Sequence, residues 1–215
     1  IAGLTAAYRL RQHGVPVRII EAQNRVGGRL FSLRNHFPNT QVCELGGELI
    51  DTNHTHIRNL AAELGIALDD LHALEDPTVT TDLWHFGGTR RSQQEVIEAL
   101  IPLAQRLEAE RANWSGDFDP TYTNPSGAGA LDRMTIAEWL DGAGASGWIR
   151  ELLDVGYTTE YGLPIDQQSS LNLLTMVELP TTRESEFLIF GESDERFRVH
   201  TGNDTIPHTL ANTLD

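Results

Sequence analysis

The fold is decided by residues 1–30, which read IAGLTAAYRLRQHGVPVRIIEAQNRVGGRL. Apolar residues recur at helical spacing through residues 4–13, and Gly14 stands where the C-cap glycine of a helix is expected. The members of this apolar stripe are Leu4, Ala6, Ala7 and Leu10. The apolar run at residues 15–20 is short, almost continuous and followed by Glu21, which is typical of a strand buried on both faces of a parallel sheet. Helix, tight turn and buried strand predict the second half of a βαβ unit.

A βαβ unit that binds a dinucleotide has a glycine-rich turn before its helix and an acidic residue at the end of its second strand. Gly3 fits the last glycine of G-x-G-x-x-G, which lets helix and strand pack closely, and the Glu21 carboxylate would accept hydrogen bonds from ribose hydroxyls. The first two glycines and the first strand would then lie upstream of residue 1. This half-pattern alone leaves open an ordinary α/β protein whose strand happens to end in Glu.

A pair of adjacent glycines, Gly27 and Gly28, follows this acid and is flanked by Arg25 and Arg29. Adjacent glycines let the backbone approach a ligand closely, and guanidinium groups beside them reach phosphate oxygens. An acid, a short spacer and R-x-G-G-R together resemble the pattern of the flavin-containing amine oxidases, a family that includes flavin monoamine oxidases of bacterial type and L-amino-acid oxidases. Rossmann enzymes that bind only NAD do not usually carry this pattern.

Two further segments carry the resemblance. The stretch CELGGELID, residues 43–51, resembles the family's second glycine pair, which lies beside the flavin ring, and residues 196–215 resemble the return to the flavin domain through a turn at 202–204. Thr201 stands where many relatives have another glycine. By this resemblance, the residues that contact FAD are Gly3, Glu21, Ala22, Arg25, Gly27, Gly28, Arg29, Leu45, Gly46, Gly47 and Glu48. The family's C-terminal flavin segment would lie after residue 215.

The fold implied by the resemblance is α/β, with a partial Rossmann-like FAD-binding domain and a mainly helical α+β insertion that forms the substrate domain. We expect the first part of the FAD-binding domain over residues 1–76 and part of the substrate domain over residues 77–195. Residues 196–215 would return to the FAD-binding domain.

The middle of the chain has clear local signals. Residues 83–91 are typical of a β-hairpin with a Gly-Gly turn, and Ser92 with Glu95 predicts a capping box. The helix that this box starts should reach about residue 112, and Pro102 should kink or split it.

Three more helices are expected, one capped by Thr135 and the others over residues 147–161 and 168–178. In relatives, the neighbourhood of the second of these forms part of the substrate cavity or its entrance. The candidates to line such a cavity are Tyr157, Glu160 and Tyr161. Roles in core packing and on the helix surface remain an alternative of at least equal weight.

Acidic side chains outnumber Lys and Arg by 31 to 16, which gives a net charge of −15. This balance disfavours nucleic acids and anionic membranes as partners, because phosphate binding needs a basic surface. No apolar run in the sequence reaches the ~18 residues of a membrane span. The one cysteine, Cys43, excludes an internal disulfide. The eight histidines lack a completing cluster of cysteines or carboxylates, so we expect no metal site.

The resemblance implies an FAD-dependent oxidase that converts the C–N bond of a primary or secondary amine, or of an L-amino acid, to an imine and reduces O2 to H2O2. The amine and O2 are the expected partners, while a homodimer and a cytoplasmic or exported location are left open. The catalytic lysine of many relatives would come later in the sequence, so no catalytic residue is assigned. Two alternatives stay open: a flavin oxidoreductase of the desaturase or protoporphyrinogen oxidase type, and a non-catalytic flavin-fold remnant.

Overall fold

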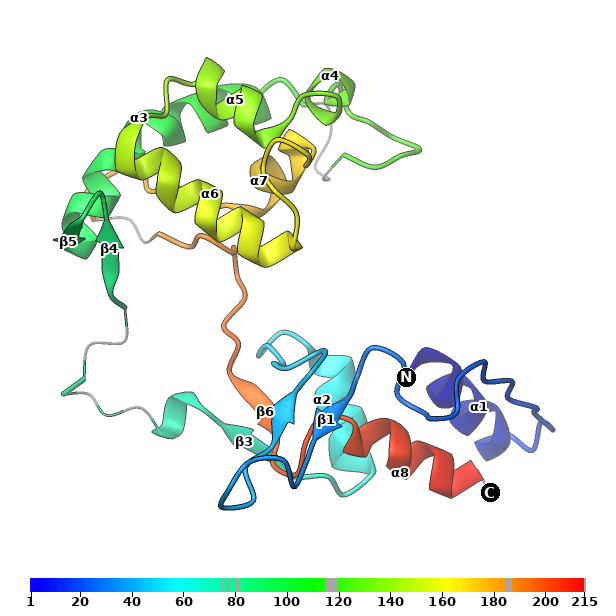
Figure 1. Cartoon of the computed structure of the whole chain (residues 1–215). Helices are drawn as coiled ribbons and strands as arrows, with labels where there is room; N and C mark the ends of the chain where they lie inside the picture. The colour runs from blue at the N-terminus through cyan, green and yellow to red at the C-terminus, as the bar shows by residue number, and fades with distance from the viewer. Residues whose placement is uncertain (75, 77, 80–81, 115–119, 185–186, 215) are drawn as a thin grey trace. The chain divides into compact units, whose positions relative to one another are not determined.

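The chain divides into two compact units, each with its own hydrophobic core (Figure 1). Unit 1 comprises Ile1–Val79 and Ser193–Asp215, and unit 2 comprises Thr80–Glu192. The sequence-based boundaries, after residues 76 and 195, lie near these two junctions. In this computed structural model the described residues are 1–74, 76, 78–79, 82–114, 120–184 and 187–214.

Unit 1 combines three α-helices with two short antiparallel strand pairs. Its elements are α1 (Ala2–Gln12), β1 (Ser32–Leu33), β2 (Cys43–Glu44), α2 (Thr55–Glu63), β3 (Leu68–Asp70), the 3-10 helix η1 (His72–Leu74), β6 (Phe197–Val199) and α8 (Thr205–Leu214). Strand β1 pairs with β2, and β3 pairs with β6. Figure 1 shows α8 beside α1, and their apolar faces share one core with α2 and β6. The buried members of this core are Leu4, Leu60, Ala61, Val199, Ile206 and Leu210.

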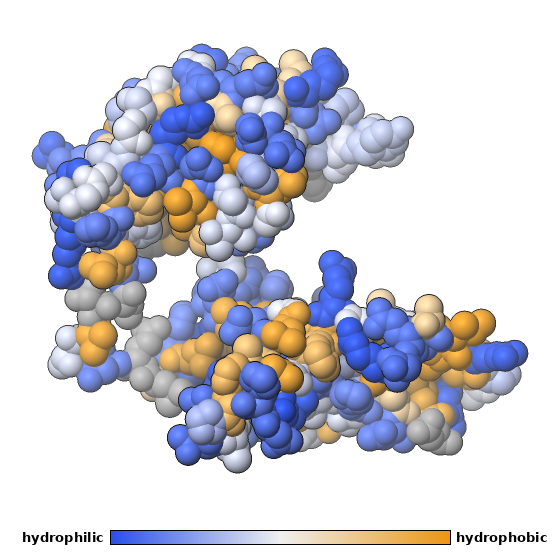
Figure 2. Space-filling view, viewed as in Figure 1, coloured by the Kyte–Doolittle hydropathy of each residue, from blue (hydrophilic) through white to orange (hydrophobic). Residues whose placement is uncertain are grey.

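The predicted first helix is confirmed as α1, and Gly14 ends it with a φ of 71° and an N–H donated to the Arg11 carbonyl. The apolar stripe is only partly buried: Leu4 and Ala7 lie in the interior, whereas Leu10 is 45% exposed. Figure 2 shows apolar surface at the end of unit 1 that carries α1. Like the segment that follows the helix, this side of α1 has no strand among the described residues to cover it.

The strand predicted over residues 15–21 is wrong for this structure, because the segment is extended but unpaired and Ile20 is 86% exposed. A strand buried on both faces needs neighbouring strands to accept its N–H groups and cover its side chains. No strand among the described residues pairs with this segment. Val17 and Ile19 instead line a cavity of about 740 Å³ together with apolar side chains of α1 and α8.

Helix α1 is held to α2 by Glu63, which accepts hydrogen bonds from Tyr8, Arg9 and Gln12 at 2.6 to 3.1 Å. The Arg9 guanidinium, followed by the Gln12 amide, lowers the pKa of Glu63 to about 2. The folded-state pKa lies below the ordinary carboxyl value, so this contact stabilises fully above pH ~4.5 and its contribution is lost as the pH falls toward about 2.

We therefore expect Glu63→Gln to make the stability of unit 1 less dependent on pH between about pH 5 and pH 2. The amide keeps the shape of the carboxylate but does not titrate. Urea unfolding followed by circular dichroism at a series of pH values measures this. An unchanged slope of the urea midpoint against pH in the variant would show that the Glu63 carboxylate does not contribute to acid unfolding.

Unit 2 is mainly helical. Its elements are β4 (Trp84–Phe86), β5 (Thr89–Arg91), α3 (Gln93–Arg111), α4 (Gly129–Asp132), α5 (Ile136–Gly142), α6 (Gly147–Tyr161) and α7 (Ser170–Met176). The predicted hairpin is confirmed as β4 and β5, whose turn residues Gly87 and Gly88 both have positive φ, as a two-residue turn that matches the strand twist requires. Both predicted capping boxes form, Ser92 with Glu95 and Thr135 with Glu138.

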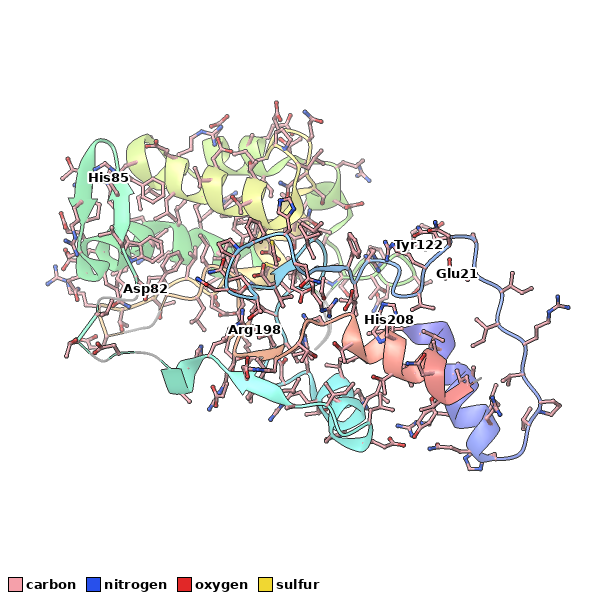
Figure 3. The ribbon with its side chains drawn as sticks, turned by 60° about the horizontal axis from the view of Figure 1, so that its bottom comes forward. Glu21, Asp82, His85, Tyr122, Arg198 and His208 are labelled. Atoms are coloured by element: carbon pink, nitrogen blue, oxygen red, sulfur yellow. The ribbon has the colours of Figure 1, made fainter. Side chains whose placement is uncertain are left out.

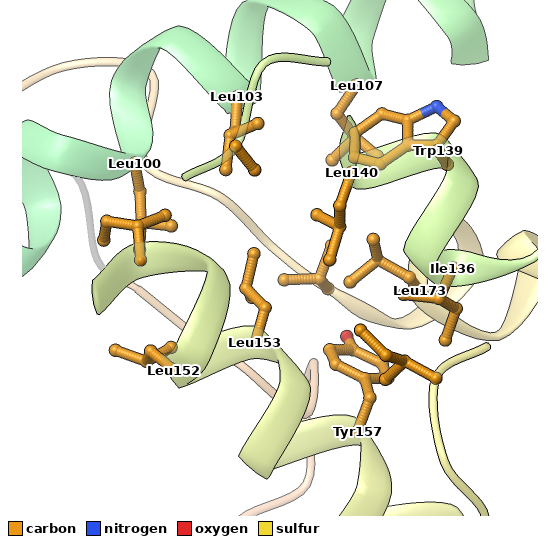
Figure 4. Packing of buried hydrophobic residues seen from close by; sticks show 14 of the residues in the cluster. Leu100, Leu103, Leu107, Ile136, Trp139, Leu140, Leu152, Leu153, Tyr157 and Leu173 are labelled. Carbon is orange, nitrogen blue, oxygen red and sulfur yellow. The ribbon is translucent and has the colours of Figure 1, made fainter. Parts of the chain in front are cut away.

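The core of unit 2 lies between α3, α5, α6 and α7, as the close view in Figure 4 shows. Pro102 lies inside α3 and does not split the helix, contrary to one of the two predicted outcomes. The stripe on α3 continues past the proline, with Leu100, Leu103 and Leu107 all buried, and this burial outweighs the hydrogen bond that proline cannot donate. Helix α7 is shorter at both ends than the predicted 168–178.

Candidate flavin-nucleotide site in unit 1

Three stretches that lie far apart in the sequence meet in unit 1: residues 25–32, residues 44–48 and the turn 202–204. The Leu45 N–H donates to the Phe31 carbonyl at 2.8 Å, and the Gly47 N–H donates to the Arg29 carbonyl at 3.1 Å. The two glycine-rich segments singled out in the sequence are thus bonded to each other through their main chains. We call residues 25–31 the first glycine loop and residues 45–48 the second glycine loop.

The first glycine loop is closed by Arg25, whose guanidinium donates to the main-chain carbonyls of Gly28 at 2.8 Å and of Val26 and Leu30 at 3.3 Å. Gly27 has a φ of 108°, and a Cβ built there would lie 2.6 Å from the Leu30 carbonyl oxygen, so this position requires glycine. Arg25 therefore shapes the loop by bonding its carbonyls, which the sequence did not predict for it.

The outer side of the first glycine loop carries Gly28 and Arg29, and both are exposed. A Cβ on Gly28 would meet open space. Among the described residues, no hydrogen bond or ion pair involves the exposed Arg29 guanidinium. Of the two flanking arginines, Arg29 is therefore the exposed one, whereas Arg25 is half-buried.

The second glycine loop lies directly on the backbone of the first. A Cβ built on Gly46 would lie 1.9 Å from the Arg29 carbonyl oxygen, and one on Gly47 would lie 2.8 Å from a methyl carbon of Leu30. All four residues of this loop are exposed on the other side, with Leu45 at 58%. The glycine pair therefore permits the backbone of the second glycine loop to lie directly against the first. The outer face of the second loop stays exposed.

A network of buried polar groups, which no sequence pattern predicted, connects these loops to the start of α8. Ser32 Oγ donates to Glu44 at 2.7 Å, and the Asn203 N–H donates to the other oxygen of the same carboxylate at 2.8 Å. Asp204 accepts from the Ser32 N–H at 2.9 Å and from Arg34 at 2.6 Å. Burial raises the pKa of Asp204, but the hydrogen bonds from Arg34 and Ser32 outweigh it and the pKa lies below its usual value.

The amino end of α1 carries Gly3, which is exposed and has open space where a Cβ would lie. The first turn has no acidic side chain, and no side chain in the described part of the chain caps it. The first glycine loop is held beside this helix, because Val26 packs in the same core as Leu4. Among the described residues, no side chain competes for the N–H groups at this helix end, as an anion site at a helix N-terminus requires.

Glu21 and Ala22 are exposed, and Figure 3 places Glu21 on the segment that runs back from the C-terminal end of α1. The Glu21 carboxylate accepts one hydrogen bond, from the Gln23 N–H at 2.8 Å. A carboxylate can accept several more, so Glu21 keeps acceptor capacity for hydroxyl groups.

In unit 2, Tyr157 has no exposed surface and lies in the core, where its hydroxyl donates to the Ile189 carbonyl at 2.9 Å. Burial raises the pKa of this hydroxyl far above its ordinary value, so it stays protonated. This position agrees with the packing role rather than with a place on a cavity wall. Glu160 is exposed, and Tyr161 is 39% exposed, on the same helix α6.

Within the described residues, no helix is both long and apolar enough to cross a bilayer. The same part of the chain holds no group of three or more His, Cys, Asp and Glu side chains that could bind a metal ion.

The family model described as flavin containing amine oxidoreductase matches residues 1–214. The chain belongs to this family of flavin-containing amine oxidoreductases. The family resemblance drawn from the glycine patterns is thereby confirmed.

Curated members of the family match part of the chain. This chain is 36% identical over 75 residues to amine oxidase [flavin-containing] B of Bos taurus. The matched stretch covers 35% of this chain and 14% of that protein. The chain is 38% identical over 66 residues to amine oxidase [flavin-containing] A of Sus scrofa, over 31% of this chain and 12% of that protein.

Solved structures of the family match 99% of this chain but less than half of their own length. Cyclohexylamine oxidase from Brevibacterium oxydans IH-35A superposes with a TM-score of 0.75 at 21% identity and is covered to 47%. Wild-type putrescine oxidase bound to putrescine superposes with a TM-score of 0.68 at 20% identity and is covered to 46%. At these identities the likeness shows the fold, a mixed α/β fold of flavin-containing amine oxidoreductases.

Proposed function

We propose that this chain forms part of an FAD-dependent amine oxidase, with unit 1 as part of a Rossmann-like FAD-binding domain and unit 2 as part of a substrate domain. The observation that carries the proposal is the direct bonding of the two glycine loops, with their outer faces exposed. These loops hold the residues that the family pattern places at the cofactor. The reaction would convert the C–N bond of a primary or secondary amine, or of an L-amino acid, to an imine with O2 as electron acceptor.

The groups present in unit 1 fit a flavin adenine dinucleotide. Its diphosphate needs N–H donors and a cation, and the uncapped amino end of α1, the Gly28 backbone and the Arg29 side chain offer these. Its ribose hydroxyls need an acceptor, and Glu21 has free acceptor capacity beside one local hydrogen bond. Gly3 leaves room for close approach, because no Cβ stands over the helix end.

The chemistry that a bound flavin would supply is two-electron oxidation of the amine, with O2 as the final electron acceptor. The residues of this chain would bind and orient the flavin nucleotide. Glu21 would lie at the ribose, Arg29 at the diphosphate and the second glycine loop at the flavin ring. Glu160 and Tyr161 remain candidates to line the path of the amine. The net charge of −15 would also favour the approach of a cationic amine.

The experiment that tests this function is titration of the purified full-length protein with FAD, combined with a peroxide-coupled screen of simple amines, polyamines and L-amino acids. Saturable FAD binding and peroxide formation with at least one amine are expected. FAD binding without peroxide from any amine would favour the non-catalytic remnant. Failure to bind FAD would overturn the proposal.

Within this titration, Arg29→Ala is expected to raise the Kd for FAD by about tenfold or more, because a charge-assisted hydrogen bond to phosphate contributes about 1.5–3 kcal/mol. Arg90→Ala is the matched control, since Arg90 is an exposed arginine in the hairpin of unit 2. The same Kd in both variants would remove Arg29 from the proposed site.

A further inference from the structure

The side chain of Asn203 is buried at the start of α8, with 3% of its surface exposed. Its Nδ2 donates to the carbonyls of Gly47 at 2.9 Å and Glu48 at 2.6 Å, and its Oδ1 accepts from the Val199 N–H at 2.8 Å. Both amide hydrogens and the amide oxygen are therefore used. This pattern of two donors and one acceptor fits an amide and no other side chain of the same shape.

The position of Asn203 is fixed from two sides. The Glu44 carboxylate accepts from the main-chain N–H of Asn203, and the Ser32 hydroxyl in turn donates to Glu44. The Val199 N–H requires the oxygen of the amide on its own side, so the nitrogen must face the second glycine loop. Asn203 therefore acts on the loop as a rigid pair of donors.

The bonds from Asn203 also set the direction of the main-chain N–H groups of the second glycine loop. In a planar trans peptide unit the C=O and N–H groups point in opposite directions. Since Asn203 holds the carbonyls of Gly47 and Glu48, the N–H groups of Glu48 and Leu49 point away from it. No acceptor for these two N–H groups exists among the described residues, and Glu48 is exposed. Two adjacent main-chain donors thus lack a partner in the part of the chain that the structure describes.

We propose that Asn203 is a positioning residue, which turns the Glu48 and Leu49 N–H groups outward to donate to acceptor atoms of a bound flavin nucleotide. This rests on the proposed function and assigns to the turn before α8 a role in the cofactor site. A main-chain N–H group that stays unbonded beneath a bound ligand costs free energy. Two such groups side by side therefore favour a ligand that places acceptor atoms against them.

Two substitutions separate this role from simple packing. Asn203→Asp keeps the volume but sets a carboxylate oxygen against two carbonyl oxygens, which drives both peptide units to turn. Asn203→Ala removes more volume but brings no repulsion. If the donors position the loop, the Kd for FAD rises by about tenfold or more in the Asp variant and less in the Ala variant. If the side chain only fills space, the order is reversed.

The control is Leu210→Ala, which removes a fully buried side chain from the same helix α8 without touching the second glycine loop. FAD titration and the visible absorption spectrum of the bound flavin are recorded well below the unfolding temperature of each variant. We expect the Asn203→Asp variant to shift the flavin absorption band and the Leu210→Ala variant to keep the wild-type spectrum.

Four outcomes decide the proposal. Weaker binding and a shifted band in the Asp variant, with the Ala variant in between, support it. A wild-type Kd and spectrum in both Asn203 variants overturn it while the proposed function stands, and so does a larger loss in the Ala variant. If the Asp variant does not fold, the Ala variant decides, because a Kd equal to that of Leu210→Ala overturns the positioning role. Absence of FAD binding by the wild-type protein is a failure of the proposed function instead.

Discussion

Replacing Gly46 by alanine is expected to raise the Kd for FAD by about 30-fold or more while unit 2 stays folded. The new Cβ would lie 1.9 Å from the Arg29 carbonyl oxygen and 2.9 Å from its carbonyl carbon. Because both are main-chain atoms, no flexible side chain can yield, and the two glycine loops must separate. Overpacking of this kind costs about 2 kcal/mol or more, which is about 30-fold in an equilibrium constant.

The experiment compares Gly46→Ala with Gly142→Ala. A Cβ on Gly142 meets open space and the residue lies in α5, so its substitution should leave FAD affinity and fold intact. All four tryptophans lie in unit 2, so tryptophan fluorescence recorded without FAD reports the fold of unit 2. Equal affinity of the two variants for FAD would mean that the contact between the glycine loops does not shape the site.

Replacing Tyr157 by alanine is expected to destabilise unit 2 by about 3–5 kcal/mol, the cost of removing a large aromatic side chain from a core. Tyr157 has no exposed surface, and it belongs to the cluster of buried residues that α3, α5, α6 and α7 contribute (Figure 4). Tyr157→Phe keeps the ring and loses only the hydrogen bond to the Ile189 carbonyl, so about 1 kcal/mol is expected. Urea unfolding followed by tryptophan fluorescence measures both.

The same pair of variants distinguishes a core residue from one that lines the substrate cavity. As a core residue, Tyr157 leaves the KM for the amine unchanged when phenylalanine replaces it. A change of several-fold in KM, with little loss of stability, would instead place the hydroxyl in contact with substrate and would contradict the packing role.

Local signals in the sequence predicted the local structure well. The capping boxes at Ser92 and Thr135 and the Gly-Gly hairpin turn depend on residues within a few positions of one another, and each formed. The strand over residues 15–21 failed because its burial depends on partners elsewhere, which no described strand supplies. Pro102 did not split α3, since contacts across the core of unit 2 outweigh one missing hydrogen bond.

The candidate site was predictable in its outline but not in its internal contacts. The glycine pairs indicated where backbone comes close, and the structure shows that Gly46 comes close to Arg29 of the same chain. No sequence pattern separates Arg25, which bonds its own loop, from the exposed Arg29. Asn203 read as a turn residue, and only its two donors to the second glycine loop reveal its connection to the site.

By the proposed function, unit 1 binds a flavin nucleotide across the amino end of α1 and the two glycine loops. Amide hydrogen exchange of the purified protein with and without FAD tests it most directly, because it reports each segment separately. We expect FAD to slow exchange at residues 2–4, 26–31 and 45–49 and to leave α3 and α6 of unit 2 unchanged. Protection confined to unit 2, or none in these three segments at saturating FAD, would contradict it.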